Sequence, residues 1–98
     1  MSVRILAAGF DPWACLSDYQ RTRPGMAAGQ SGATAVFVGT MRDFNQGDAV
    51  QRLFLEHYPG MTESHLDKIA AEAAQRWDLI DTLIVHRVGE LKPGDPIV

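Results

Sequence analysis

The sequence predicts an α+β fold in which two helices accompany a mostly antiparallel β-sheet. Short apolar segments suited to strands alternate with two helix-like segments, in the order β-α-β-β-α-β-β. Several links between them are short enough for hairpins, which favours antiparallel pairing over the long crossovers that parallel strands need. The chain has 98 residues, the size of one small domain, and no internal repeat or linker divides it.

The first part of the chain predicts a strand, a helix, a loop and a second strand. Residues 3–8 alternate weakly between apolar and other side chains, as a strand does. Asp11 followed by proline predicts a helix start, because the aspartate can cap free backbone N–H groups; the helix runs to about residue 21. Residues 22–32 are rich in glycine and proline and predict a loop. Residues 33–38 are apolar on both faces, which is typical of a central strand covered on both sides.

The second part predicts a polar connection over residues 39–48 and a strand over residues 50–58. A helix follows over residues 62–77, with an apolar stripe at spacings of three and four formed by Leu66, Ile69, Ala70, Ala73 and Trp77. Residues 79–88 predict a third main strand. Residues 92–95 predict a type II turn, because proline and glycine occupy its two central positions, and residues 97–98 begin a further strand.

Composition and charge exclude several classes of protein. The net charge of −3 argues against a generally basic protein that coats nucleic acid. No apolar run approaches the roughly 20 residues that cross a bilayer, and the apolar stretch at the N-terminus is too short for a signal peptide. We therefore expect a cytoplasmic protein with no membrane or nucleic-acid partner.

Cysteine and histidine usage gives no support for a metal or cofactor site. Cys15 is the single cysteine, so no intrachain disulfide can form, and we expect it to be a small buried apolar residue. The three histidines lack the spacing of zinc ligands, and neither a phosphate-binding loop nor a GxGxxG turn occurs. We expect no metal and no cofactor.

The connection over residues 39–48 is the strongest candidate for a binding site. It is longer than most hairpin loops and places Arg42, Asp43 and Asn45 between two glycines, which allow close approach of the backbone to a ligand. Arg42 could bind a phosphate or carboxylate through two hydrogen bonds. The alternative is a solvated hairpin loop in which Arg42 pairs with Asp43 or Asp48.

Three blocks give the chain a family resemblance. GTMRDFN, LEHYPGMTE and HRVGELKPGD, in this order and spacing, resemble the MoaE family, the catalytic (large) subunit of molybdopterin synthase. The resemblance runs from about residue 32 to residue 98, and the first thirty residues match more loosely. It implies a MoaE-like α/β hammerhead fold for a single domain over residues 1–98.

The resemblance also implies a reaction and its partners. Family members transfer sulfur to cyclic pyranopterin monophosphate and so form molybdopterin in molybdenum-cofactor biosynthesis. The sulfur arrives as a thiocarboxylate on the C-terminus of a small ubiquitin-like (MoaD-like) subunit. The large subunit forms a homodimer with one small subunit at each end, a heterotetramer.

Residue by residue, the resemblance places Thr40, Met41 and Arg42 at positions that contact the pterin substrate, with Arg42 as the anion anchor and Asn45 in the same loop. Relatives often carry lysine at position 40, so Thr40 implies one charge fewer in the site. Phe37 either forms an apolar wall of the pocket or belongs to the core.

The family pattern continues past the counterpart of Val98 with a His-Arg pair and the lysines used in catalysis. The sequence therefore predicts that residues 1–98 are a C-terminally incomplete domain, with substrate-binding residues but no catalytic residue. Two other interpretations stay open. One is a truncated, non-catalytic module that pairs with the small subunit or dimerises, and the other is a small anion-binding α+β domain.

The remaining candidates favour structural roles. His57 and His86 lie within shared blocks but lack a visible partner that would tune their pKa, so structural hydrogen bonding is favoured for both. Arg87 is expected to pair with an acidic group such as Glu56. Trp13 and Trp77 are expected to be core or interface residues.

Overall fold

The computed structural model describes residues 1–23, 29–45, 48–49 and 52–98 and confirms the α+β class with two helices. Its elements, in chain order, are β1 (Ser2–Leu6), α1 (Pro12–Thr22), β2 (Phe44–Asn45), β3 (Asp48–Ala49), β4 (Leu53–Leu55), α2 (Met61–Trp77), β5 (Leu83–Arg87) and β6 (Gly89–Leu91). The middle of the predicted loop over residues 22–32, residues 24–28, lies outside the described residues.

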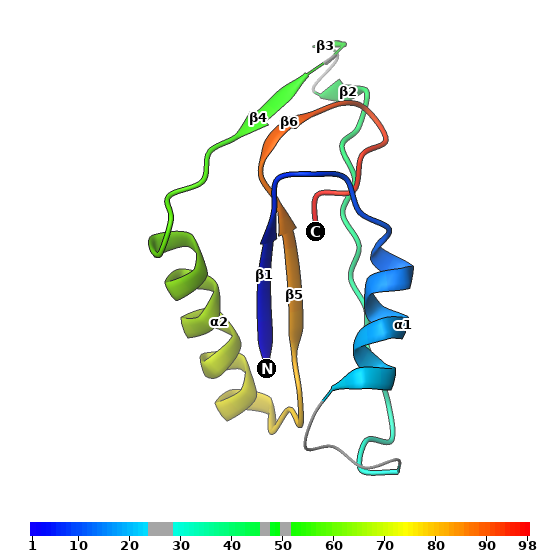
Figure 1. The fold of residues 1–98 in the computed structure, drawn as a ribbon, viewed down its shortest axis with the longest axis vertical. Helices are drawn as coiled ribbons and strands as arrows, with labels where there is room; N and C mark the ends of the chain where they lie inside the picture. The colour runs from blue at the N-terminus through cyan, green and yellow to red at the C-terminus, as the bar shows by residue number, and fades with distance from the viewer. Residues whose placement is uncertain (24–28, 46–47, 50–51) are drawn as a thin grey trace.

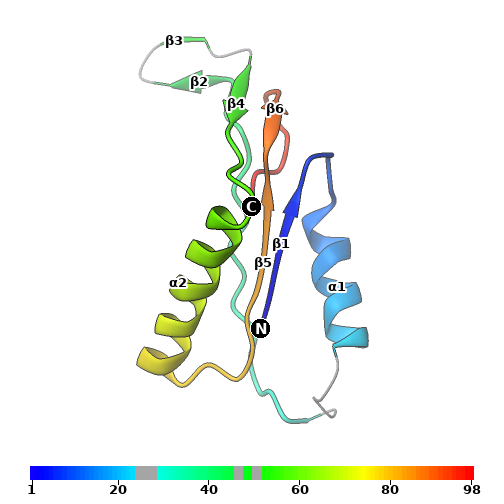
Figure 2. The same ribbon diagram turned by 60° about the vertical axis from the view of Figure 1, so that its left-hand side comes forward.

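Two parallel strands form the centre of the molecule. β1 pairs with β5 over five residues, from Ser2 opposite Leu83 to Leu6 opposite Arg87. Figures 1 and 2 show α2 on one side of this pair and α1 on the other. α2 packs against β1, and α1 packs against β5. The longest strand pair is thus parallel, and its two strands are separated by most of the chain. The antiparallel prediction was based on short links between consecutive strands, and such links carry no information about a pair this far apart in sequence.

The other strand pairs are short and antiparallel. β2 pairs with β3, β4 pairs with β6, and Thr40 forms an isolated antiparallel bridge with Pro96. Antiparallel pairs therefore predominate in the described part of the chain, as predicted, although the strands make three separate two-stranded sheets.

α1 begins where the sequence predicts. Asp11 Oδ1 accepts hydrogen bonds from the backbone N–H groups of Trp13 and Ala14 at 2.9 and 3.2 Å, and Pro12 occupies the first helical position. The helix buries Tyr19, which is only 8% exposed. Trp13 remains 62% exposed, so it is not part of the core.

α2 begins one residue before the predicted start and ends at the predicted residue, Trp77. The Glu63 carboxylate accepts the backbone N–H of Gly60 at 2.6 Å and so satisfies one free donor at the helix start. Asp78 ends the helix in the left-handed conformation, with φ of 51°. Of the predicted stripe, Ala70 is buried, Leu66 and Ala73 are half-buried, and Ile69 and Trp77 are exposed.

Residues 33–38 do not form the predicted central strand. They belong to no named strand, and Val36 and Phe37 are 49% and 80% exposed. Pairing begins only at Gly39 and Thr40, whereas residues 33–38 make no backbone hydrogen bond with another part of the described chain. An apolar run suits a strand whose two faces are covered, but a central strand also needs neighbouring strands for its backbone hydrogen bonds, and the described residues provide none beside residues 33–38.

Three other predicted strands are found but are shorter, whereas residues 97–98, predicted to begin a further strand, belong to no named strand. The first comprises Ser2–Leu6 instead of residues 3–8, and the third comprises Leu83–Arg87 instead of residues 79–88. The predicted strand over residues 50–58 is reduced to Leu53–Leu55; residues 50–51 lie outside the described residues. The predicted polar connection over residues 39–48 contains strand β2 and the start of β3, which the sequence did not indicate.

The turn over residues 92–95 is confirmed. The backbone N–H of Asp95 donates to the carbonyl of Lys92 at 3.0 Å, and Gly94 has φ of 90°, the positive angle that a type II turn requires at this position. Among the residues whose burial is described, the buried apolar ones are Tyr19, Met41, Ala70, Val85, Val88 and Leu91. Neither helix in the described ranges is long and apolar enough to cross a membrane.

Candidate functional site

The start of the candidate loop is held against the last residues of the chain by backbone hydrogen bonds. The N–H of Gly39 donates to the carbonyl of Val98 at 2.9 Å, and the N–H of Met41 donates to the carbonyl of Asp95 at 2.9 Å. The N–H of Gly94 returns a bond to the carbonyl of Met41 at 2.8 Å. These bonds fix the backbone on the N-terminal side of Arg42.

This junction forms a shallow pocket. It has a volume of about 470 Å³ and is lined by Met41, Arg42, Asp43, Pro93 and Gly94. Met41 is 5% exposed and supplies the buried side, whereas Arg42 and Asp43 are exposed. The pocket thus presents a guanidinium beside backbone that is fixed from two segments, an arrangement that can bind a phosphate or a carboxylate.

The other predicted site residues are only partly brought together. Thr40 is exposed and forms the bridge to Pro96, next to the pocket. Asn45 lies in β2 opposite Asp48; its side chain lies outside what the structure describes. Phe37 is 80% exposed and lines a different, larger groove, so the core interpretation of Phe37 is wrong.

Gly39 allows the two segments of the junction to approach closely. A β-carbon at this position would lie 3.3 Å from Val98 Cγ1 and 3.5 Å from Phe37 Cε1. The first distance is shorter than ordinary carbon–carbon contact. A larger residue at position 39 would therefore require the Val98 side chain to shift by a few tenths of an ångström.

Arg87 and Asp95 form an ion pair next to the turn that contributes Pro93 and Gly94 to the pocket. Arg87 Nη1 lies 3.8 Å from Asp95 Oδ2, and Nη2 donates to the carbonyl of Glu90 at 3.0 Å. Asp95 Oδ2 also accepts the backbone N–H of Lys92 at 2.9 Å and so closes the turn that contributes to the pocket. The expected pairing of Arg87 with an acidic residue is confirmed, but Glu56 as its partner is wrong, because Glu56 accepts its hydrogen bond from Tyr58.

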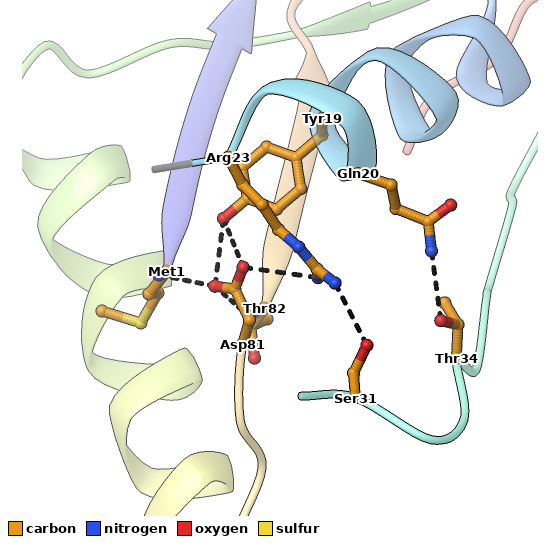
Figure 3. A network of polar contacts seen from close by, with 8 residues as sticks. All are labelled: Met1, Tyr19, Gln20, Arg23, Ser31, Thr34, Asp81 and Thr82. Carbon is orange, nitrogen blue, oxygen red and sulfur yellow. Dashed lines mark hydrogen bonds and ion pairs between the residues drawn. The ribbon is translucent and has the colours of Figure 1, made fainter. Parts of the chain in front are cut away.

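A second polar centre lies at the other end of β5 (Figure 3). Asp81 accepts two hydrogen bonds from the Tyr19 hydroxyl, at 3.0 and 2.9 Å, and one from the backbone N–H of Thr82 at 2.9 Å. The amino group of Met1 lies 2.7 Å from Asp81 Oδ1, and Arg23 Nη1 lies 3.7 Å from Oδ2. One carboxylate therefore joins β1, α1 and the start of β5.

The charge of Asp81 is stabilised by these partners. Burial raises the pKa of this carboxyl. Hydrogen bonds from the Met1 amino group, the Tyr19 hydroxyl and the Thr82 N–H together lower the pKa by more than burial raises it, so it lies below the ordinary 3.8. Burial and the Asp81 hydrogen bond raise the pKa of Tyr19 above its ordinary 10.0. Both groups keep one protonation state near neutral pH, which suits a structural joint and not proton transfer.

His57 makes the structural hydrogen bond that the sequence favours. Its Nε2 donates to Glu63 Oε1 at 2.6 Å. This hydrogen bond, together with the one from the Gly60 N–H, lowers the pKa of Glu63. His86 lines a separate pocket of about 370 Å³ with Tyr58 and His65.

Cys15 is half-buried and lines the large groove along α1, so the expected burial of this residue is only partial. Within the described ranges, no three His, Cys, Asp or Glu side chains gather as metal ligands would.

Comparison with known proteins identifies the family. A sequence model described as MoaE protein matches residues 12–98. The chain belongs to the MoaE family. Two curated relatives, each named molybdopterin synthase catalytic subunit, are similar along the chain. The one from Pseudomonas aeruginosa is 51% identical over 98 residues, and the one from Ralstonia nicotianae is 50% identical over 97 residues.

This MoaE-family chain spans only part of the relatives it matches. The match covers 100% of the chain but 62% of the P. aeruginosa protein, and 99% of the chain but 52% of the R. nicotianae protein. A solved MoaE protein from Burkholderia ambifaria has a TM-score of 0.75 and 46% identity, and the match covers 99% of this chain and 59% of that one. A second structure, from Burkholderia multivorans, has the same TM-score and 49% identity.

The sequence did not indicate that the turn over residues 92–95 meets the candidate loop. The sequence predicts only a turn, with Pro93 and Gly94 at its centre and Asp95 at its end. Their place in the pocket depends on the pairing of segments about fifty residues apart, which local patterns do not contain. The available signal was that both segments lie in blocks that carry the MoaE resemblance.

Proposed function

We propose that this MoaE-family chain carries the substrate-binding loop of a molybdopterin synthase catalytic subunit. One observation supports this most directly. The GTMRDFN and HRVGELKPGD blocks lie far apart in the sequence, yet they pair through backbone hydrogen bonds and together line the pocket that contains Arg42. Two relatives that match nearly the whole chain carry the name of this enzyme.

In this proposal the pocket binds cyclic pyranopterin monophosphate. Arg42 binds the phosphate, because a guanidinium can donate two parallel hydrogen bonds to its oxygens. Met41 provides the apolar floor, and Thr40, next to the pocket, and Asn45, in the same loop, are the further pterin contacts in this proposal. Phe37 does not line this pocket. Its side chain lines the separate groove along α1, so this proposal gives it no contact with the substrate.

The proposed reaction transfers sulfur from the thiocarboxylate of a small ubiquitin-like subunit to the bound pterin, giving the dithiolene of molybdopterin. We propose that two large subunits form a homodimer and that each binds one small subunit, in the cytoplasm. The residues described above bind and orient the substrate, and none of them is assigned to the sulfur-transfer step itself.

The first prediction concerns Arg42. Replacing it with alanine should weaken binding of cyclic pyranopterin monophosphate tenfold or more, because losing one charge-assisted contact costs about 1.5–3 kcal/mol. Arg42→Lys should lose less, since it keeps the charge but not the paired geometry. Isothermal titration of the chain with the substrate, repeated with inorganic phosphate as competitor, measures both effects.

Arg76→Ala is the matched control. This arginine is exposed on α2, where it stacks over Trp77 at 5.0 Å from the ring centroid, and it takes no part in the pocket. Its loss should leave affinity unchanged. Equal affinity in Arg42→Ala and the parent chain would assign the loop a structural role. Tight binding of the small subunit without any substrate binding would instead favour a non-catalytic docking module.

A further inference from the structure

Arg87 carries a guanidinium that neighbouring residues enclose. Its side chain is 12% exposed, and Nη1 lies 3.8 Å from Asp95 Oδ2. Nη2 donates to the carbonyl of Glu90 at 3.0 Å. Nε is buried and has no hydrogen-bond partner within the described residues. A charge with so little access to water is costly unless an opposite charge lies near it, and Asp95 supplies that charge.

Both ends of the Arg87 side chain are confined. Its backbone lies at the end of β5, opposite Leu6 in the parallel pair, and its N–H donates to the carbonyl of Ile97 at 2.8 Å. At the other end, a β-carbon at Gly9 would lie 3.6 Å from Nη1, so the segment after β1 lies against the guanidinium. The guanidinium is therefore held in one place and can fix the position of a group that binds it.

Asp95 connects this guanidinium to the turn over residues 92–95. Oδ2, the oxygen that lies near Arg87, also accepts the backbone N–H of Lys92 at 2.9 Å. The N–H of Asp95 donates to the carbonyl of Lys92 at 3.0 Å. Side chain and backbone thus close the turn together, and one carboxylate oxygen serves both the turn and the contact with Arg87.

The turn in its place holds the residue before Arg42. The carbonyl of Asp95 accepts the N–H of Met41 at 2.9 Å, and the N–H of Gly94 donates to the carbonyl of Met41 at 2.8 Å. Gly94, Met41 and Arg42 line the same pocket, which we call the Arg42 pocket. A continuous series of contacts therefore leads from Arg87 to this pocket, although neither Arg87 nor Asp95 is among the described residues that line it.

We propose that Arg87 is a positioning residue for the Arg42 pocket and that it acts through the Asp95 carboxylate. The ion pair orders the turn, the turn orders the backbone of Met41, and Arg42 is thereby presented to an anionic ligand in one geometry. Because Arg87 is shielded from water, its attraction to Asp95 is screened less than that of an exposed pair. Only the identity of the ligand rests on the proposed function; the coupling of Arg87 to Met41 can be measured in the chain alone.

Amide hydrogen exchange in Arg87→Gln tests this coupling without any ligand. Met41 and Gly94 donate the N–H groups that join the loop to the turn, and both should exchange roughly tenfold faster than in the parent chain. Ala70, a buried residue of α2, should exchange at the parent rate. Unchanged exchange at Met41 and Gly94 would overturn the proposal. Equal acceleration at Ala70 would also overturn it, because the effect would then be a general loss of stability.

Arg87→Lys tests whether charge and geometry both contribute. The lysine keeps a positive charge near Asp95, but its single ammonium group replaces the guanidinium fork that also binds the Glu90 carbonyl. Met41 and Gly94 should therefore exchange about threefold faster than in the parent chain, less than in Arg87→Gln. If circular dichroism shows that Arg87→Gln does not fold, this variant decides. Parent rates at both amides would then overturn the proposal.

Arg52→Gln is the matched control. Arg52 Nε lies 3.3 Å from Glu90 Oε1, so this variant also removes an arginine that pairs with an acidic residue close to the turn. The Arg52 side chain is 76% exposed, and neither member of that pair bonds to the Asp95 carboxylate. Met41 and Gly94 should exchange at the parent rate. Acceleration equal to that in Arg87→Gln would contradict a specific role for Arg87.

Ligand binding separates positioning from simple attraction between charges. Arg87→Gln and Asp95→Asn change the net charge in opposite directions, so attraction alone predicts weaker binding of an anion in the first variant and tighter binding in the second. Positioning predicts binding of cyclic pyranopterin monophosphate that is about fivefold weaker or worse in both, with little further loss when the two changes are combined. Isothermal titration measures all three. Tighter binding in Asp95→Asn would overturn the proposal.

The two measurements also distinguish this inference from the proposed function. A parent chain that binds neither the pterin nor inorganic phosphate, together with faster exchange in Arg87→Gln, would overturn the proposed function and support the coupling of Arg87 to the loop. A parent chain that binds the pterin no more tightly than Arg87→Gln does would overturn the positioning role and leave the proposed function intact.

Discussion

Asp81 joins three parts of the described chain through one carboxylate. Its carboxylate is 12% exposed and accepts from the Tyr19 hydroxyl, the Thr82 N–H and the amino group of Met1. The sequence did not single it out, because an aspartate after a helix resembles a surface turn residue. Its importance follows from partners on β1 and α1, which only the folded chain brings together.

Asp81→Asn should lower the free energy of unfolding at neutral pH by about 1–3 kcal/mol, because it removes charge-assisted hydrogen bonds in a half-buried place. The folded-state pKa lies below the ordinary 3.8, so the contribution of the carboxylate is complete above about pH 4 and is lost as the pH falls through the lowered pKa. Urea unfolding of both proteins from neutral to acidic pH measures the difference.

Asp18→Asn provides the control for Asp81. Asp18 pairs with Arg21 on the exposed side of α1, where its side chain is 64% exposed, and its loss should change stability by no more than about 0.5 kcal/mol. A gap between the Asp81 variant and the parent that stays constant into acid would show that charge at Asp81 is not the cause.

Arg42 illustrates what local composition can reveal at this scale. A guanidinium in a long, glycine-flanked loop predicted an anion site, and the structure places Arg42 at an exposed pocket. The buried half of that pocket, Met41, carried no such signal. Met41 is 5% exposed, and its backbone is hydrogen-bonded to Gly94 and Asp95, which follow β6.

Among the elements, the helices were predicted more accurately than the strands. α1 and α2 carry their own start signals and satisfy most of their hydrogen bonds internally. Residues 33–38, by contrast, have the composition of a central strand but become one only if partners lie on both sides. The sequence pattern thus indicates that this segment is suited to a central strand. Within the described residues no strand pairs with it, so it remains extended and exposed.

Asp11→Ala should destabilise α1 by about 1 kcal/mol, because the backbone N–H groups of Trp13 and Ala14 lose their acceptor. Asp11→Asn keeps a side-chain oxygen at the same place and should change stability by only a few tenths of a kcal/mol. Urea unfolding followed by circular dichroism gives both values. An asparagine variant as unstable as the alanine variant would show that charge, and not capping, determines the effect.

At the scale of the whole molecule, the chain exposes more surface than a compact domain of its mass. Its accessible surface is 7140 Å², whereas a 10.8 kDa monomer typically exposes about 5,500 Å². The radius of gyration, 15.2 Å, also exceeds the roughly 13 Å typical of 100 residues. The surplus of roughly 1,600 Å² is about twice the area that each partner buries in a standard protein interface, about 800 Å².

Part of this surplus is apolar and should bind a hydrophobic fluorescent dye. Phe37→Ser and Phe54→Ser should each reduce the dye fluorescence, because these rings are 80% and 68% exposed. Gln75→Ser, an exposed polar change on α2, is the matched control and should have no effect. Dye titration at fixed protein concentration measures all three. Unchanged fluorescence in both phenylalanine variants would place the dye-binding surface elsewhere.

The parallel pairing of β1 with β5 also determines when the chain can fold during its synthesis. β1 leaves the ribosome first, yet its partner begins at Leu83. At about 5–20 residues per second, the ribosome needs roughly 4–16 s to make the intervening residues. During that time the apolar side chains of Val3, Ile5 and Leu6 have no strand to pair with. The centre of the molecule therefore cannot form until β5 has been made, and β1 waits for its partner through most of the synthesis of these residues.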